Sequence, residues 1–324
     1  MHVRHDWRYE ELADIYHQPF LDLIHQAQGV LRIYFLPNLV QRGTLLSLKT
    51  GECPEDCAYC AQSTHNCAEI ELQPLLTQEQ ALAKARLAKN AGASRFCMSA
   101  AWREVEDGPE FERVLEIVQK VADLGLEPCC TLGMISRAQA ERLKAAGCVY
   151  YNHNLDTSPE YYAKIVTTHN YQDRLRTLRH VRQAGLKLCS GGIVGMGEPL
   201  RERLEFLKQL TTQNPHPDSV PLNLLVPITG TPLENSPILE SIEYVRLVAT
   251  ARIVLPRSLI RVAAGRMRLS PEAQALCFLA GANSIFCGEK LLTTPNTGED
   301  EDRHLMERLG LKFAGESAMR RPLD

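Results

Sequence analysis

Short apolar runs alternate with longer amphipathic segments along most of the chain, from about residue 43 onward. Between the apolar runs, segments with apolar residues at helical spacing predict helices. Four of these segments end at a glycine, the usual left-handed stop for a helix: residues 78–92, 110–125, 137–147 and 171–185. The apolar runs are rich in β-branched, aromatic or cysteine residues or are bounded by Gly and Pro, and eight of them predict strands: residues 44–48, 94–99, 127–132, 149–154, 186–191, 220–225, 259–264 and 283–287.

Eight strands that alternate with helices over about 250 residues predict an α/β fold, a (β/α)₈ barrel of the TIM type. A doubly wound open sheet is the alternative. We expect N-terminal helices in residues 1–42, the barrel in 43–290 and a short, charged C-terminal tail in 291–324 that forms one helix and then frays. No low-complexity linker interrupts the chain, so we expect a single domain over residues 1–324.

Composition and charge narrow the class of protein. The chain has 324 residues, of which 44% are hydrophobic and 23% charged, as in ordinary globular enzymes. The formal net charge is −3 and the Lys and Arg residues are scattered, so we expect no nucleic-acid partner. The N-terminal sequence has no apolar segment of signal-peptide length, and no window approaches the apolar length of a membrane span. We therefore expect a cytoplasmic protein with no membrane partner.

The chain has 11 cysteines, which is a high and odd number. Complete internal pairing is therefore excluded, and metal binding or catalysis is favoured over a disulfide framework. Cys148, Cys277 and Cys287 are expected to be small buried apolar residues.

Three cysteines gather in GECPEDCAYC, residues 51–60, which follows the first predicted strand. Active sites of such barrels lie at the carboxyl ends of the strands, where this loop would sit. Closely spaced Cys53, Cys57 and Cys60 are typical ligands of zinc or of an iron–sulfur cluster. A closed zinc site needs a fourth ligand, which His65 or Cys67 could supply.

Cys97, Cys129 and Cys189 lie inside the second, third and fifth predicted strands, where inward-pointing thiols would converge in one barrel. A single buried thiol in a strand is usually core packing. Cys129 is followed by Cys130, and alternation puts the two on opposite faces of the strand. Arg261 lies among apolar residues of the seventh strand, where a buried guanidinium needs a partner, such as a barrel carboxylate.

Polar residues also cluster at two strand ends. Asn152, Asn154 and Asp156 share one side of the fourth strand and its exit, and His153 faces away. Such groups inside a barrel need polar partners, either a bound molecule or neighbouring backbone.

The run CSGGIVGMGE, residues 189–198, is rich in glycine but lacks the spacing of a dinucleotide-binding loop. Its glycines would allow close approach of a nucleoside to the backbone, or simply tight turns.

The spacing Cys53-x₃-Cys57-x₂-Cys60 resembles the signature of the radical S-adenosylmethionine enzymes, and Tyr59 before the last cysteine also fits. This resemblance implies a [4Fe–4S] cluster on the three thiolates, with an open iron that chelates S-adenosylmethionine, and Tyr59 against the adenine. It further implies reductive cleavage of S-adenosylmethionine to methionine and a 5′-deoxyadenosyl radical.

Six segments together resemble the biotin synthase family over roughly residues 10 to 310: SLKTGECPEDCAYCAQS, RFCMSAAW, YYNHNLDTSPEYY, CSGGIVGMGE, VPLNLLVPITGTPL and AGANSIF. The resemblance implies that dethiobiotin receives sulfur to form biotin, with a [2Fe–2S] cluster as the sulfur donor. The ligands that it implies for this second cluster are Cys97, Cys129, Cys189 and Arg261. The sequence that flanks residue 129 places the ligand there and not at Cys130.

The same resemblance implies the remaining contacts. Asn154 and Asp156 would hold the amino-acid and ribose parts of S-adenosylmethionine, and Asn152 and Asn223 would face the ureido ring of dethiobiotin, beside Asn154. Arg174 would pair with the methionyl carboxylate, and the alternative is an ordinary surface arginine of a helix. The implied partners are an electron-donor protein such as flavodoxin or ferredoxin, iron–sulfur assembly proteins and a second copy in a homodimer.

Two other functions are kept as alternatives. A different radical S-adenosylmethionine enzyme, such as a mutase or lyase, would need Cys53, Cys57 and Cys60 but not Cys97 or Cys189. A non-enzymatic zinc or iron–sulfur binding protein would not cleave S-adenosylmethionine.

Overall fold

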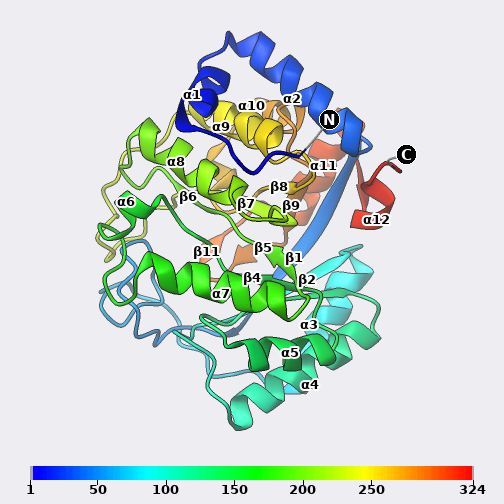
Figure 1. The fold of residues 1–324 in the computed structure, drawn as a ribbon. Helices are drawn as coiled ribbons and strands as arrows, with labels where there is room; N and C mark the ends of the chain where they lie inside the picture. Colours follow the sequence, from blue (N-terminus) through cyan, green and yellow to red (C-terminus); the bar gives the residue numbers. More distant parts are fainter. Residues whose placement is uncertain (1–2, 323–324) are drawn as a thin grey trace.

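The computed structural model describes residues 3–322, and its centre is a closed parallel β-barrel (Figure 1). The sheet closes where β9 pairs with β1, which excludes the open-sheet alternative and confirms the (β/α)₈ prediction. β5 and β6 share one barrel position, since each pairs with β7. The barrel strands are β1 (Leu39–Lys49), β2 (Arg95–Ala100), β3 (Glu127–Thr131), β4 (Tyr150–Asn152), β5 (Lys187–Cys189), β6 (Gly192–Val194), β7 (Ser219–Leu224), β8 (Leu259–Val262) and β9 (Ser284–Cys287).

Helices follow the strands and cover the outside of the barrel (Figure 1). The four helices expected from glycine-terminated segments are present, and the glycines that follow them have positive φ angles of 74° to 94°. The helices between the strands are α3 (Gln78–Asn90), α4 (Pro109–Asp123), α5 (Arg137–Ala145), α6 (Pro159–Tyr162), α7 (Tyr171–Gln183), α8 (Leu200–Thr211), α9 (Ser241–Val254), the 3₁₀ turn η1 (Arg266–Arg268) and α10 (Pro271–Leu279).

The main core lies between the barrel and these helices. On α4, for example, the buried residues recur at helical spacing and face the strands: Phe111, Val114, Ile117, Val118 and Val121. Burial of each such side chain contributes roughly 1.5–3 kcal/mol. Cys148, Cys277 and Cys287 are buried in this core, as the sequence predicted.

Two helices precede the barrel, as expected: α1 (Tyr9–Tyr16) and α2 (Phe20–Tyr34). α1 packs on α8 and α9, and α2 packs on α9 (Figure 1). The first strand begins at Leu39, earlier than the boundary expected at residue 43.

The expectation that the tail frays is wrong for the part that the structure describes, through residue 322. A hairpin of β10 (Lys290–Leu291) and β11 (Thr294–Pro295) is followed by α11 (Glu299–Leu309), β12 (Lys312–Ala314) and α12 (Glu316–Met319). β12 pairs in parallel with the start of β1, and both Glu316 and Met319 are buried. The tail stays ordered because its charged residues find buried partners.

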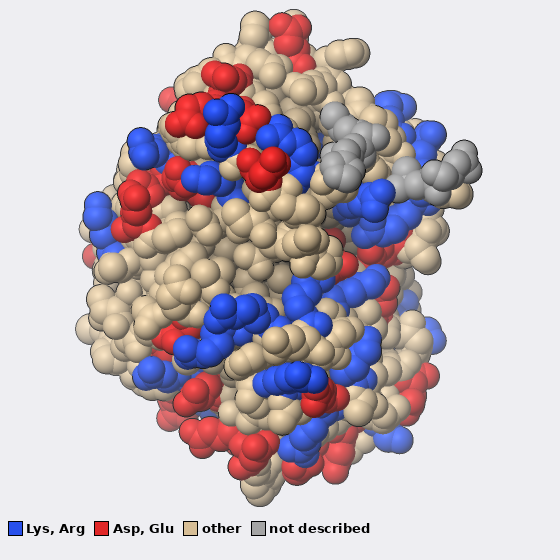
Figure 2. Space-filling view, viewed as in Figure 1, with Lys and Arg blue, Asp and Glu red and all other residues tan. Residues whose placement is uncertain are grey.

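The face drawn in Figure 2 carries Lys and Arg interspersed with Asp and Glu. On α7 several of the cations are ion-paired: Arg176 lies 2.5 Å from Asp173, and Arg182 lies 2.9 Å from Asp218. Within residues 3–322, no helix combines the length and the hydropathy that a bilayer span requires.

A buried ion pair fastens the tail to the barrel. Asp302 of α11 receives two hydrogen bonds from Arg266, at 2.5 and 2.8 Å, and both side chains are almost completely buried. We expect Asp302→Asn to lower the free energy of unfolding by about 3–5 kcal/mol, because it leaves the Arg266 charge buried without a counter-charge. Urea unfolding would measure this.

The matched control is Asp300→Asn on the same helix. Asp300 is 88% exposed in its pair with Arg303, so its loss should cost no more than about 1 kcal/mol. Equal effects of the two substitutions would contradict the anchoring role of Asp302.

Candidate active site

A cavity of about 240 Å³ lies at the carboxyl ends of the barrel strands, where active sites of this fold are found. The structure brings together there residues from the cysteine loop and from β2, β3, β4, β5, β7 and β8. The predicted site residues that line it are Tyr59, Cys60, Cys97, Cys129, Asn152, Asn154, Asp156, Cys189, Asn223 and Arg261. Cys53 and Cys57 lie in the same loop as Cys60.

Hydrogen bonds within the cysteine loop shape it. The amide of Cys53 donates to the carbonyl of Gln62 at 2.9 Å. The side-chain amide of Asn66 donates to the carbonyls of Cys57 and Cys60, at 3.1 and 2.8 Å. The loop backbone is therefore held by polar partners other than the thiols, which stay available as ligands.

Two acidic residues tie this loop to the segment between α6 and α7. Asp56 accepts hydrogen bonds from the amides of Thr167 and Thr168, at 2.9 and 3.2 Å. Although burial opposes ionisation, a hydrogen bond from the Thr167 hydroxyl and those from the two amides lower the pKa of Asp56 to about 2. The buried carboxylate of Glu55 lies 2.7 Å from Nδ1 of His169.

Polar contacts continue from this segment to the exit of β4. The hydroxyl of Tyr162 lies 2.7 Å from Nε2 of His169 and accepts a hydrogen bond from Nε of Arg174 at 2.8 Å. Nη2 of Arg174 pairs with Asp156 at 2.8 Å, and the hydroxyl of Tyr59 donates to the same carboxylate at 2.9 Å. Because its side chain is only 12% exposed, Arg174 is not the surface arginine of the alternative interpretation.

The backbone at Asp156 supports this arrangement. Its φ angle is +65°, in the left-handed region that residues other than glycine rarely adopt. This conformation turns the chain at the exit of β4, and the Asp156 side chain lines the cavity, where Tyr59 and Arg174 hold it.

Burial keeps the loop thiols protonated when no ligand is bound. It raises the pKa of Cys60 to about 11 and also raises the pKa values of Cys53 and Cys57. Metal ligation requires thiolates, so metal binding to this loop would release protons.

The barrel cysteines meet on the inside of the sheet. Cys97, Cys129 and Cys189 form a buried cluster with Tyr150, and strand pairing places Cys97 directly beside Cys129. A hydrogen bond with Cys129, helped by the positive charge of Arg261, lowers the pKa of Cys97 to about 7 against the effect of burial. Burial raises the pKa of Cys189.

Arg261 of β8 is fully buried and lines the same cavity. Its Nε donates to Ser284 and its Nη2 to Gln41, both at 2.8 Å, and its Cζ lies 4.3 Å from the centre of the Phe286 ring. Nη1 has no hydrogen-bond partner. Within residues 3–322 Arg261 forms no ion pair with a carboxylate, so the explanation by a barrel salt bridge is wrong.

Strand residues that alternate with the cavity-lining residues face away from the cavity. Cys130 packs in the core between barrel and helices, whereas Cys129 lines the cavity. His153 is buried outside the cavity lining, and burial lowers its pKa well below the usual range.

The three asparagine side chains differ in how many of their hydrogen-bonding groups have partners within the protein. Asn152 donates to Thr131 at 3.1 Å, and its side-chain oxygen is buried without a partner. Asn154 accepts a hydrogen bond from the amide of Gly191 at 3.1 Å. Asn223 donates to the carbonyl of Gly192 at 2.9 Å and accepts from the amide of Ala264 at 3.0 Å. Each amide group still has unused bonding capacity toward the cavity.

The glycine run has a packing explanation. A Cβ at Gly191 would lie 1.9 Å from the carbonyl oxygen of Pro221, and one at Gly192 would lie 2.4 Å from that of Asp156. These two glycines are therefore required by neighbouring backbone, and close approach of a nucleoside is not needed to explain them.

The residues named as fourth zinc ligands have other surroundings. Nε2 of His65 lies 3.2 Å from the carbonyl oxygen of Pro54, and Cys67 is exposed. In the described part of the chain, no three His, Cys, Asp or Glu side chains form a group that could hold a metal ion as they stand.

Sequence reasoning missed several residues around the site. Glu55 and His169 carry no recognisable spacing signal, because they meet only through the fold. Arg95 could have been found, since it is a charged residue inside an apolar strand, the same signal that singled out Arg261. It lies fully buried beneath the barrel cysteines.

The barrel and its three-cysteine loop define the class, and comparison with known families agrees. A model of the Radical SAM superfamily matches residues 47–210, and the Biotin and Thiamin Synthesis associated domain matches residues 221–312. The chain is therefore a radical S-adenosylmethionine enzyme, which sets the non-enzymatic alternative aside.

It is 57% identical to a biotin synthase of Thioalkalivibrio sulfidiphilus, over 95% of this chain and 91% of that one. It is 54% identical to a biotin synthase of Acinetobacter baumannii, over 96% and 94%. The chain belongs to the biotin synthase family.

Solved structures support the fold alone. Methylornithine synthase (PylB) superposes with a TM-score of 0.79 at 21% identity, over 96% of this chain and 95% of that one. HydG, a maturase of the [FeFe]-hydrogenase, gives a TM-score of 0.81 at 16% identity, over 94% and 72%.

Removal of one loop thiol tests the loop as an iron–sulfur site. We expect Cys57→Ala to lose most of the reducible [4Fe–4S] signal in anaerobically prepared protein, because each thiolate holds one iron. Cys67→Ala, at an exposed position, should keep it. Iron analysis and electron paramagnetic resonance of the reduced proteins would measure both. Loss of the signal in Cys67→Ala would instead indicate a fourth protein ligand.

Proposed function

We propose that this chain converts dethiobiotin to biotin, with S-adenosylmethionine as the radical source and a [2Fe–2S] cluster as the sulfur donor. The observation that carries the proposal is the composition of one cavity. Three thiols from separate strands, a buried arginine and a group of strand-end amides line it together, next to the cysteine loop. Family membership supports the same reaction.

The chain would hold two iron–sulfur clusters, one on the cysteine loop and one inside the barrel. Cys53, Cys57 and Cys60 would hold a [4Fe–4S] cluster, as three thiolates without a protein fourth ligand are suited to do. When bound, the first cluster would supply the electron that cleaves S-adenosylmethionine, and the second would supply the single sulfur atom of the product.

The donor set in the barrel fits a second cluster. Cys97, Cys129 and Cys189 present three soft ligands to one space. Arg261 adds a buried Nη1 without a partner at the same cavity. A lone buried guanidinium nitrogen is costly unless something accepts from it, so this atom supports a ligand in that position.

The network at the exit of β4 would bind S-adenosylmethionine. Arg174 would pair with the methionyl carboxylate, and Asn154 and Asp156 would accept hydrogen bonds from the amino-acid and ribose parts. Tyr59 would lie against the adenine while its hydroxyl holds Asp156. The contacts from Arg174 and Tyr59 fix the Asp156 carboxylate before any ligand arrives, which reduces the ordering cost of binding.

Dethiobiotin would lie between the two groups. The ureido ring carries N–H donors and a carbonyl acceptor, which suit the unpartnered oxygen of Asn152 and the remaining capacity of Asn223 and Asn154. The surrounding barrel would orient the substrate and exclude water, because a primary carbon radical reacts with whatever lies nearest.

The reaction requires an electron from outside the chain, and we include in the proposal a small donor protein such as flavodoxin or ferredoxin. Consumption of a sulfur-donating cluster also requires iron–sulfur assembly proteins. A homodimer in the cytoplasm, organised as a single barrel domain over residues 1–324, completes the proposal.

The direct test is anaerobic incubation of reconstituted protein with S-adenosylmethionine, dethiobiotin and a reducing system. We expect biotin and 5′-deoxyadenosine to form together, as measured by mass spectrometry. Asn152→Ala should lower biotin formation at least about tenfold, because it removes a polar contact to the substrate. Asn154→Ala should in addition raise the KM for S-adenosylmethionine, because Asn154 is proposed to contact both molecules. Cleavage of S-adenosylmethionine without any biotin would favour a different radical enzyme on the same barrel.

A further inference from the structure

The lower end of the barrel, opposite the cavity, is closed by the end of the chain. We call β12 and α12, residues 312–319, the C-terminal plug. It is fastened by the pairing of Lys312 with Leu39, by a hydrogen bond from the amide of Leu36 to the carbonyl of Met319 at 2.8 Å, and by burial of the Met319 side chain. Nearly all of the plug lies beyond the residues that the two family models match.

A layer of charged side chains lies directly beneath the barrel cysteines. Each cysteine has a charged residue two positions before it, and strand alternation places the two on the same face, one layer apart. The pairs are Arg95 with Cys97, Glu127 with Cys129 and Lys187 with Cys189. The charged layer is therefore part of the same inner face of the barrel as the thiols.

Tyr150 joins the two layers. It belongs to the buried cluster of cysteines and pairs in register with Cys129. Cζ of Arg95 lies 3.4 Å from the centre of its ring, and both side chains are completely buried. The ring and the guanidinium together form the floor of the space into which the thiols point.

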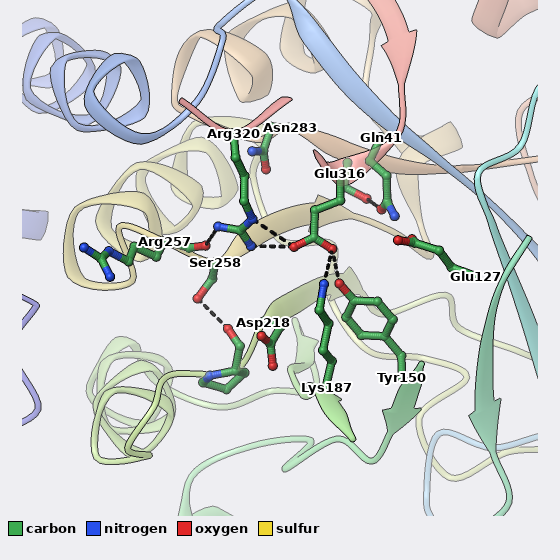
Figure 3. Close-up of polar contacts among 12 residues, drawn as sticks. Gln41, Glu127, Tyr150, Lys187, Asp218, Arg257, Ser258, Asn283, Glu316 and Arg320 are labelled. Carbon is green, nitrogen blue, oxygen red and sulfur yellow. Dashed lines mark hydrogen bonds and ion pairs between the residues drawn. The ribbon is translucent and has the colours of Figure 1, made fainter. Parts of the chain in front are cut away.

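Glu316 enters this layer from the plug, as Figure 3 shows. Nη2 of Arg95 and Nζ of Lys187 each lie 3.3 Å from its Oε2, and the hydroxyl of Tyr150 donates to the same oxygen. Arg320 binds Oε1 at 2.6 and 3.0 Å. The Glu316 side chain is only 3% exposed.

No other carboxylate in the described chain takes this place. Glu127 lies 3.6 Å from Nε of Arg95, which is too far for a hydrogen bond, and it is 31% exposed. Without Glu316, the carboxylate that remains near Arg95 is that of Glu127, which pairs with it without a hydrogen bond, so the buried guanidinium would be poorly compensated, which is unfavourable. The floor therefore depends on a residue of the plug.

We propose that Glu316 is a positioning residue that seals the chamber of the barrel cysteines from below. It holds Tyr150 and Arg95 in place, so that solvent reaches Cys97, Cys129 and Cys189 only through the upper cavity. The seal itself is a property of the folded chain, and its use, protection of a sulfur-donating cluster, rests on the proposed function.

Site-resolved alkylation tests the seal without any cluster. Metal-free, full-length protein is treated with iodoacetamide, and mass spectrometry follows each cysteine. In Glu316→Gln, which removes the charge at nearly constant size, we expect the three barrel cysteines to react at least about tenfold faster than in the wild type. The control is Glu307→Gln on α11, an exposed carboxylate, which should change nothing.

Other cysteines of the same chain separate sealing from general destabilisation. Cys60 reports on the upper face, and Cys130 and Cys277 report on the core outside the barrel. The proposal requires that these three keep their wild-type rates in Glu316→Gln. A parallel increase at Cys130 and Cys277 would show a merely structural role, and unchanged rates at the barrel cysteines would show that Glu316 seals nothing. Either result overturns the proposal.

A milder variant covers the case in which Glu316→Gln fails to fold. Arg320 is 34% exposed and reaches the floor through Glu316; its guanidinium also donates to the carbonyl of Arg257 at 3.0 Å and lies over the ring of Phe35. Arg320→Gln should raise the reactivity of the same three cysteines by a smaller factor of a few fold. An unchanged pattern in this variant would likewise contradict the seal.

The use of the seal is tested in protein that carries both clusters. We expect Glu316→Gln to accelerate chelator-driven loss of the [2Fe–2S] absorbance about tenfold, while the [4Fe–4S] signal decays at the wild-type rate. Equal loss of both signals would overturn this use. A seal seen by alkylation in a protein that forms no biotin would leave the floor in place and reject the proposed function.

Discussion

Closure of the parallel sheet is the constraint on which the rest of the structure depends. Once β9 pairs with β1, every second residue of each strand must face one enclosed space, and its polar groups must find partners there. The inner face is accordingly layered. The Arg95 guanidinium and the Tyr150 ring form the floor and are held by Glu316. Cys97, Cys129 and Cys189 lie above the floor, and the asparagines lie at the strand ends of the same cavity. This layering places buried soft ligands at the inner end of the cavity and hydrogen-bonding groups nearer the strand ends.

The two ends of the barrel are covered by segments that lie far apart in the sequence. Above, Asp56 and Glu55 bind the cysteine loop to the segment before α7, and the network through His169, Tyr162 and Arg174 continues to Asp156. Below, the C-terminal plug supplies the carboxylate that accepts a hydrogen bond from Arg95. In both places a buried charge is compensated by a partner from another element, because an isolated charge in such surroundings is costly. A cluster held between these ends would be open to solvent only through the upper cavity.

Much of this was predictable from the sequence. Hydrophobic runs and glycine stops located all eight strand positions and the four helices, since these depend on local periodicity and on the φ angles that glycine allows. The cysteine loop and the barrel cysteines stood out by spacing and by strand alternation. The ordered structure of the tail was not predictable, because its polar composition suggests exposure. Glu316 is in fact buried among cations. For the glycines at 191 and 192 the sequence left a nucleoside contact and a tight turn as alternatives, whereas the structure shows close contact with the backbone of Pro221 and Asp156. Such contacts depend on which segments meet, and a single sequence does not show that.

The central claim is that one barrel holds two different iron–sulfur clusters, and spectroscopy of matched variants tests it most directly. Iron and sulfide contents, with visible spectra, would be measured on anaerobically reconstituted wild type and on a Cys97→Ala, Cys189→Ala double variant. A Cys130→Ala, Cys148→Ala variant, which alters buried thiols outside the cavity, is the control. The account predicts both cluster types in the wild type and in the control, and selective loss of the [2Fe–2S] component in the first variant. A lone [4Fe–4S] spectrum that is the same in all three proteins would contradict it.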